Sequence, residues 1–293
     1  SRMAHVQLAP GRFHGRLLGA ESGSQRLDYG HYNLPLHVRG NLPGTHLTLG
    51  FVLQNKQSTS LNGYGIEGPT LVVLPEGESL DYRLAPDTKW AAFQTSRESL
   101  ARLGIDASRL AQTLVSGAKS PHMARLQQVL LEAIACLEEV AAEATEIAAP
   151  QQFGHNVFGE VMDAFQAVLD RGDTEGEQLP RRRASDADLV RRATDYIDAN
   201  LGETVQIGRL CVELNTNWRA LEAAFRRLLG ITPKRYVQLV RLARTRRLLL
   251  QPRNAGRTVA EIAVACGISH LGRFSRAYYS AFGEMPSATL RRG

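Results

Sequence analysis

The chain has 293 residues, 43% of them hydrophobic, and a formal net charge of +6 at pH 7. This length and apolar content are sufficient for two domains with a buried core in each, which excludes a protein dominated by disorder. The sequence has no apolar run of about 18 residues or more, and no apolar run follows the basic residues of SRMAHVQLAPGR. We therefore expect a cytoplasmic protein without a membrane span or a signal peptide.

The charge is distributed unevenly along the chain. Residues 181–293 contain 21 Lys and Arg against 9 Asp and Glu, a net charge of +12, whereas residues 1–180 have a net charge of −6. A basic segment of this size is typical of proteins that bind a polyanion such as nucleic acid.

Residues 25–95 are predicted to form strands. THLTLGFVL, TLVVLP, SLDYRLA and KWAAFQT are short runs rich in β-branched, leucine and aromatic residues, and Gly/Pro/Asn clusters such as NLPG and NGYG separate them. Short strands at this spacing favour a small antiparallel barrel or sandwich. From Ser96 the pattern becomes helical, and Gly104 is expected to end the first helix.

Residues 121–148 have the clearest helical pattern of the N-terminal half. Apolar residues recur there at alternating spacings of three and four, as in a heptad repeat. This stripe predicts either a dimer interface or packing of the helix against its own domain, and Val129 and Ile134 widen it beyond a narrow seam. A second helix is predicted over 153–169, so residues 121–169 could supply a homodimer face. The positions expected to dimerise are Leu126, Leu130, Leu137 and Val140.

Residues 170–185, DRGDTEGEQLPRRRAS, lack apolar periodicity and are rich in charge, glycine and proline. This composition predicts an interdomain linker. It separates a ligand-binding and dimerisation domain at 1–169, with strands up to about residue 95 and helices over about 96–169, from a basic domain at 186–293.

Two helix pairs repeat in the basic domain. The apolar spacing i, i+3, i+4, i+7 predicts a short helix, a break at NTN and a second helix that ends at Gly230. The same spacing then returns, with GIS as the turn and Gly283 as the end of the second helix. The two copies, 207–229 and 259–282, are predicted helix-turn-helix motifs.

The turn residues support both copies. Asn215 and Gly267 tolerate a left-handed backbone, and Asn217 and Ser269 are the expected N-caps of the second helix in each pair. Between the copies, TPKRYVQLVRLARTRRLLL begins with a capping threonine and a proline at the first helical position, which predicts one stiff linking helix.

Over about residues 186–293 the two unequal copies, the centre AAFRRLLGITPKRYVQLVRLARTRRLL and the ending SHLGRFSRAYYSAFGEMPSATLR resemble the AraC/XylS family of bacterial transcription regulators. Cys211, Asn215 and Tyr278 depart from that family's usual residues without altering the expected chemistry. The resemblance implies a DNA-binding transcriptional activator that works with RNA polymerase and is controlled by a small effector. It implies an α+β fold: an N-terminal cupin-like antiparallel β-barrel with a dimerisation helix pair, and a C-terminal all-α domain with two helix-turn-helix motifs joined by a linking helix.

By this resemblance, the second helix of each pair enters the major groove of double-stranded DNA. The outward residues near its start are expected to read bases, whereas Arg226 and Arg273 are expected to hold phosphates. The expected DNA-binding residues are Asn217, Trp218, Arg219, Glu222, Ala223, Arg226, His270, Gly272, Arg273, Ser275 and Arg276.

The alternative is a cupin-type metal-dependent enzyme fused to a DNA-binding domain. Such a metal site needs converging histidines and a carboxylate, usually with an H-x-H pair. LHVRG has Arg39 where the second histidine would be required, and no nucleotide-binding or nucleophile motif occurs. We therefore expect no catalytic residue, no metal and no cofactor. The histidines of the N-terminal region are scattered at His5, His14, His31, His37 and His46.

An effector site is expected in the N-terminal domain. RFHGR and STSLNG resemble the R-x-x-x-R and (D/N)-x-S-x-x-G motifs with which PilZ domains hold cyclic di-GMP, although a serine replaces the Asp/Asn position. Paired arginines suit a diphosphate because each guanidinium can bind it in a bidentate manner. A small metabolite is the alternative effector. The candidate ligand-binding residues are Arg12, Arg16, Arg39, Ser58, Ser60 and Gly63, and other polar residues that could line a barrel mouth are Tyr32, His37, Tyr64, Glu67, Tyr82, Arg83 and Trp90.

Overall fold

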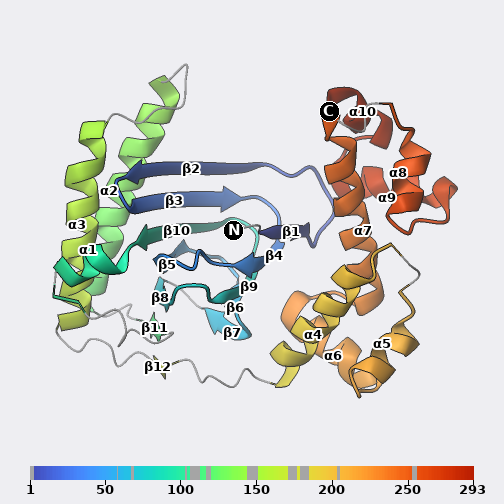
Figure 1. The fold of residues 1–293 in the computed structure, drawn as a ribbon, viewed down its shortest axis with the longest axis horizontal. Coiled ribbons are helices and arrows are strands. Elements are labelled where there is room, and N and C mark those ends of the chain that lie inside the picture. The colour runs from blue at the N-terminus through green and yellow to red at the C-terminus, as the bar shows by residue number, and fades with distance from the viewer. Residues whose placement is uncertain are drawn as a thin grey trace.

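The strands of the protein lie between two groups of helices (Figure 1). Helices α2 (Pro121–Glu143) and α3 (Gln151–Asp170) cover one side, and the helices of residues 185–293 lie on the other. No helix among the residues described is long and apolar enough to cross a membrane. The computed structural model describes residues 3–57, 59–66, 69–102, 104–105, 113–116, 120–143, 151–170, 177–178, 185–202, 205–252 and 256–293.

The strands form two antiparallel sheets. The five-stranded sheet has the order β1 (Ala4–Gln7), β4 (Leu36–Asn41), β9 (Ser79–Leu84), β6 (Thr59–Leu61) and β7 (Tyr64–Ile66). The seven-stranded sheet has the order β12 (Glu177–Gln178), β11 (Thr113–Ser116), β8 (Thr70–Leu74), β5 (Leu47–Gln54), β10 (Thr88–Thr95), β3 (Gln25–Tyr32) and β2 (Gly15–Ser22).

Of the two predicted arrangements, an antiparallel barrel or a sandwich, the strands described do not form a closed barrel. No strand of one sheet pairs with a strand of the other, so each sheet keeps two edges. Strands β1 and β2 also begin before residue 25, where strands were first expected. The result is two open sheets with an interior between them.

The helices of the N-terminal half pack on the seven-stranded sheet. After α1 (Arg97–Arg102), helix α2 begins at Pro121, where the Ser120 hydroxyl accepts a hydrogen bond from the Met123 amide at 3.3 Å. The apolar stripe of α2 packs against α3 and the sheet in one core. In that core the rings of Phe93 and Phe158 lie 5.6 Å apart.

The C-terminal half is helical, as predicted, and its caps follow the sequence with one exception. Asn217 accepts from the Ala220 amide at 2.9 Å, and Gly230 and Gly283 end their helices in the left-handed conformation, with φ of 72° and 69°. The expected cap Ser269 is wrong, because His270 occupies the N-cap position and makes no side-chain capping bond. The helices are α4 (Ser185–Ala199), α5 (Ile207–Glu213), α6 (Trp218–Leu229), α7 (Pro233–Leu249), α8 (Val259–Ala265), α9 (Leu271–Phe282) and α10 (Pro286–Arg292).

Candidate nucleic-acid interface and ligand cavity

Helix α6, the second helix of the first pair, has one buried face and one open face. Leu221 and Phe225 are completely buried and anchor the helix on α4 and α7. On the opposite face Arg219 is exposed, and Trp218 keeps 42% of its surface accessible. Arg226 is also exposed and pairs with Glu222 at 2.9 Å. The open face therefore presents hydrogen-bond donors and positive charge to the solvent.

Helix α9 of the second pair repeats this division. Phe274 and Tyr278 are buried with their rings 5.6 Å apart, and the Tyr278 hydroxyl donates to Thr289 at 2.9 Å. These contacts fix the helix on α7 and α10. Arg273 and Arg276 are exposed on the other face. The remaining candidates of this face are His270 and Gly272, which are exposed, and Ser275, which is half-buried.

A basic groove of about 680 Å³ runs between the two helix pairs. Lys234 and Arg241 of α7 line one side, and His270 and Arg273 line the other. Burial lowers the pKa of Arg241 from its ordinary value, but an arginine side chain keeps its positive charge in proteins. The groove and the open faces of α6 and α9 each carry cationic donors, which suit the phosphates and base edges of a duplex.

The comparisons with known proteins match the helical half of the chain. Residues 210–292 match the family described as "Helix-turn-helix domain". Over 101 residues, 34% of this chain, the sequence is 39% identical to the "XylDLEGF operon transcriptional activator" of Pseudomonas putida. A "probable AraC family transcriptional regulator" from Rhodopseudomonas palustris is 36% identical, with 96% of that chain and 36% of this one covered and a TM-score of 0.33. The chain belongs to the AraC/XylS family of transcription regulators. It spans about a third of the length of the curated relatives it matches, and these relatives are regulators, not enzymes.

Outside this AraC-type region, the two sheets enclose a cavity of about 500 Å³. Its walls are mostly apolar, with Tyr82 on the five-stranded side and Gly50 on the seven-stranded side. Two buried polar atoms of its lining residues, Thr48 Oγ1 and Trp90 Nε1, have no hydrogen-bond partner within the described part of the chain. Unpaired buried polar atoms cost free energy, and a ligand could satisfy these two only if the groups that cover them moved aside. The cavity suits a largely apolar molecule with one or two polar groups.

Among the residues expected at a barrel mouth, Tyr32, Tyr82 and Trp90 do line this cavity. His37 and Arg39 instead contact the helical domain, through Tyr236 and Asp198 respectively.

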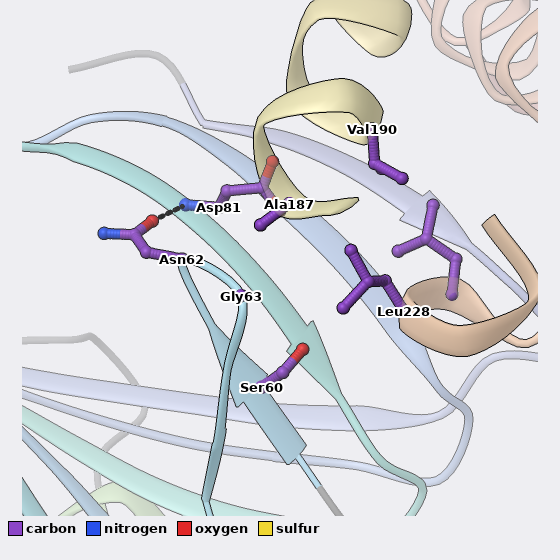
Figure 2. Close-up of a pocket in the computed structure, with 8 residues that line it drawn as sticks. Ser60, Asn62, Gly63, Asp81, Ala187, Val190 and Leu228 are labelled. Atoms are coloured by element: carbon purple, nitrogen blue, oxygen red, sulfur yellow. Dashed lines mark hydrogen bonds between the residues drawn. The ribbon is translucent and has the colours of Figure 1, made fainter. Parts of the chain in front are cut away.

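The structure does not bring the six candidate ligand-binding residues together. Arg12 lies against Gly283, and Arg16 pairs with Glu138 of α2 at 2.8 Å. Ser60 and Gly63 line a pocket of only about 10 Å³ between the β6–β7 turn and the helical domain (Figure 2). A space of that size holds one water molecule at most. Arg39 lies beside this turn in ion pairs with α4, and Ser58 is outside the described residues.

The four candidate dimerisation residues lie mainly inside the chain. Leu126, Leu130 and Leu137 are buried in the chain's own core, and Val140 is half-buried. Leu131 on the same helix has 46% of its surface exposed. A dimer through this helix pair therefore stays a prediction, and its contacts would come from the exposed face of α2.

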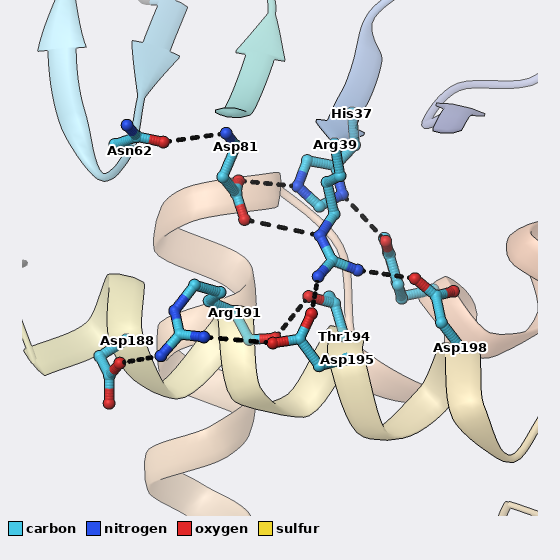
Figure 3. Close-up of polar contacts among 10 residues, drawn as sticks. His37, Arg39, Asn62, Asp81, Asp188, Arg191, Thr194, Asp195 and Asp198 are labelled. Atoms are coloured by element: carbon cyan, nitrogen blue, oxygen red, sulfur yellow. Dashed lines mark hydrogen bonds and ion pairs between the residues drawn. The ribbon is translucent and has the colours of Figure 1, made fainter. Parts of the chain in front are cut away.

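Sequence reasoning missed a polar cluster between the sheets and the helices. It comprises His37, Arg39, Asp81, Asp195, Asp198 and Tyr236, called the interdomain cluster below (Figure 3). His37 and Tyr236 are 199 positions apart in the chain, so local spacing held no signal for their contact.

Proposed function

We propose that the protein is a sequence-specific DNA-binding transcription regulator, an activator controlled by a small effector in the cavity between its sheets. The observation that carries the proposal is the pair of helices α6 and α9, which each bury one apolar face and expose arginines on the other. Helices of this kind read base edges in the major groove. The proposed site of action is promoter DNA in the cytoplasm, together with RNA polymerase.

In this mechanism Arg219 and Arg276 donate to base edges, for which guanine O6 and N7 are the preferred acceptors of arginine. Arg226 and Arg273 hold phosphates and set the register. The linking helix α7 connects the two pairs, so that α6 and α9 can reach successive major grooves about 34 Å apart.

Genomic footprinting of the purified full chain, followed by gel-shift titration of the recovered site, tests this function. Arg219→Ala and Arg276→Ala are each expected to cost about 1–3 kcal/mol of binding free energy and to relax base preference at one position. Arg97→Ala is the matched control, because Arg97 pairs with Glu76 in the N-terminal half. Unchanged affinity and sequence preference in both test variants would remove these helices from the DNA interface.

The proposed effector is a largely apolar molecule, because the cavity of about 500 Å³ has mostly apolar walls. An environment-sensitive apolar dye, anilinonaphthalene sulfonate, is a suitable first probe. Gly50→Leu should reduce its binding, because a side chain at Gly50 meets only the Val72 carbonyl oxygen at 3.9 Å and would extend into the cavity. Equal dye binding by the wild type and the variant would refute the cavity as the site.

Cyclic di-GMP is the second candidate effector, supported by the two short motifs around Arg12, Arg16, Ser60 and Gly63. It requires a rearrangement, because Gly63 approaches Ala187 so closely that a Cβ on Gly63 would lie 2.3 Å from the Ala187 Cβ. Calorimetry with cyclic di-GMP decides the point: no heat and no change in melting temperature would exclude this ligand.

The proposed homodimer uses the helices within residues 121–169. Its support is the exposed Leu131 on α2. Sedimentation of the full chain with and without DNA tests it, and a strict monomer under both conditions would contradict it.

A further inference from the structure

The five-stranded sheet has two different faces, and both are occupied. In β9, Leu80, Tyr82 and Leu84 line the cavity between the sheets, whereas Asp81 alternates with them and points to the helical domain (Figure 3). In β4, Val38 lines the same cavity. Since successive side chains of a strand point to opposite faces, one layer of backbone separates the cavity from the interdomain cluster.

His37 joins the sheet to the linking helix. Its side chain is completely buried, with Nε2 2.9 Å from Asp81 Oδ1 and Nδ1 2.9 Å from the Tyr236 hydroxyl. Burial raises the pKa of Tyr236 above its ordinary value, so the hydroxyl stays protonated. In the neutral imidazole, Nε2–H donates to the carboxylate and the Tyr236 hydroxyl donates to Nδ1, so both ring nitrogens are satisfied.

Arg39 joins the same sheet to α4. Its guanidinium pairs with Asp198 at 2.7 Å and with Asp195, and its side chain is only 13% exposed. Asp81 lies 3.7 Å from the Arg39 Nε, so sheet and helix carboxylates share one cation (Figure 3). Removing Arg39 would therefore take away the cation that Asp81, Asp195 and Asp198 share.

The apolar part of the contact is a true core. Val6 of β1 and the adjacent Leu8 are buried in the same cluster as Tyr236 and Phe225. The following residues reach the second helix pair, where the Gly11 amide donates to the Ser280 carbonyl at 3.1 Å. The N-terminal half thus contacts both helix pairs, and its position bears on how α6 and α9 are oriented relative to each other.

We propose that strands β4 and β9 couple occupancy of the cavity to the DNA-binding domain, and that Arg39 is the positioning residue through which α4 follows the sheet. The inference rests on the proposed function. A molecule in the cavity presses on Val38, Leu80 and Tyr82, and the displaced strands shift Arg39 and His37 on their other face. The shift reaches α4 through Asp195 and Asp198, and α7 through Tyr236.

A double-mutant cycle in the full chain tests the coupling, with Gly50→Leu as a built-in occupant of the cavity. The first readout is the affinity for footprinted DNA, and the second is hydrogen exchange of the α4 amides, residues 185–199. In the wild-type background, Gly50→Leu should change both the DNA affinity and the hydrogen exchange of α4. In the Arg39→Met background, the same substitution should change neither readout. The expected coupling factor is at least about fivefold in affinity, the lower end of typical allosteric coupling.

The controls separate coupling from general damage. Asp195→Asn/Asp198→Asn should reproduce Arg39→Met from the helix side, whereas Arg97→Met removes an ion pair within the N-terminal half and should leave the response intact. Ala92→Leu, also in the cavity wall, replaces Gly50→Leu if that variant does not fold. The proposal would be overturned if Gly50→Leu changed the DNA affinity by the same factor in the wild type and in Arg39→Met. It would also be overturned if neither cavity variant changed the hydrogen exchange of α4. If the wild type showed no specific DNA binding, the proposed function would be refuted. The coupling could still be tested in that case, because hydrogen exchange of α4 does not depend on DNA.

Discussion

Tyr236→Phe removes one hydroxyl from the interface between the five-stranded sheet and the linking helix. The hydroxyl lies 2.9 Å from His37 Nδ1, and both side chains are buried. Phenylalanine keeps the edge-to-face contacts of the ring with His37, at 5.5 Å, and with Phe225, at 5.6 Å, so the substitution leaves no large cavity. What remains is a buried imidazole nitrogen without a partner, which costs about 1–3 kcal/mol.

We therefore expect Tyr236→Phe to lower the free energy of unfolding by about 1–3 kcal/mol in urea titrations followed by circular dichroism. Tyr279→Phe on α9 is the control, because Tyr279 is 55% exposed and its change should stay within about 0.5 kcal/mol. Equal midpoints and slopes for Tyr236→Phe and the wild type would show that His37 does not depend on this hydroxyl, and the description of the interdomain cluster would be incorrect.

Two further predictions concern the helical domain. Gly230→Ala places a Cβ at φ 72° with only Arg83 Nη2 nearby, at 3.8 Å, so backbone strain alone should lower the free energy of unfolding by about 1–2 kcal/mol. Gly208→Ala lies inside α5, where the added Cβ meets nothing within 4 Å beyond its own helix backbone and chain neighbours, so the melting temperature should stay equal or rise. The same shift of melting temperature in both variants would contradict the assignment of strain. Arg273→Ala should weaken DNA binding to all sequences alike and reduce the magnitude of the slope of log affinity against log salt by about 1, as expected for a lost phosphate contact. A loss of sequence preference confined to one base position would instead make Arg273 a base-reading residue.

The helical domain could be predicted because its signals are local. The period of 3.6 residues places Phe225 and Tyr278 on buried faces, and Asn217 and Gly230 mark helix ends through their own hydrogen bonding and backbone preferences. The one wrong cap, Ser269, is displaced by a single residue, which is within the usual uncertainty of helix ends.

The sheets were predicted less well because strand pairing and strand facing depend on distant residues. LHVRGN of β4 alternates apolar and polar residues, the pattern of a strand with one solvated face. Its polar face is buried all the same, because α4 and α7 cover His37 and Arg39. The short motifs around Arg12 and Ser60 failed to converge for a related reason. Arg12 precedes β2 and lies against Gly283 of the helical domain, whereas Arg16 lies within β2 and pairs with Glu138 of α2.

Thr48 lies in the cavity wall, and its substitution by valine is expected not to destabilise the protein, unlike most core substitutions. Thr48 Oγ1 is buried and, among the described residues, unpaired. Thr48→Val replaces this hydroxyl by a methyl group of similar shape and removes its desolvation cost, so the free energy of unfolding should stay equal or rise by up to about 1–2 kcal/mol.

Thr59→Val is the matched comparison, since Thr59 is also completely buried but its hydroxyl accepts a hydrogen bond from the Ala85 amide at 3.2 Å. Losing that acceptor leaves a buried amide unpaired, so Thr59→Val should lower the free energy of unfolding by about 1–3 kcal/mol. Urea titrations of both variants measure the difference. Equal destabilisation by the two substitutions would mean that the Thr48 hydroxyl has a partner in solution, such as a bound water, and that this part of the cavity wall is more polar than its residues indicate. Opposite signs would establish that the Thr48 hydroxyl is buried without a hydrogen bond, so that an effector could gain free energy from it only by moving the groups that cover it.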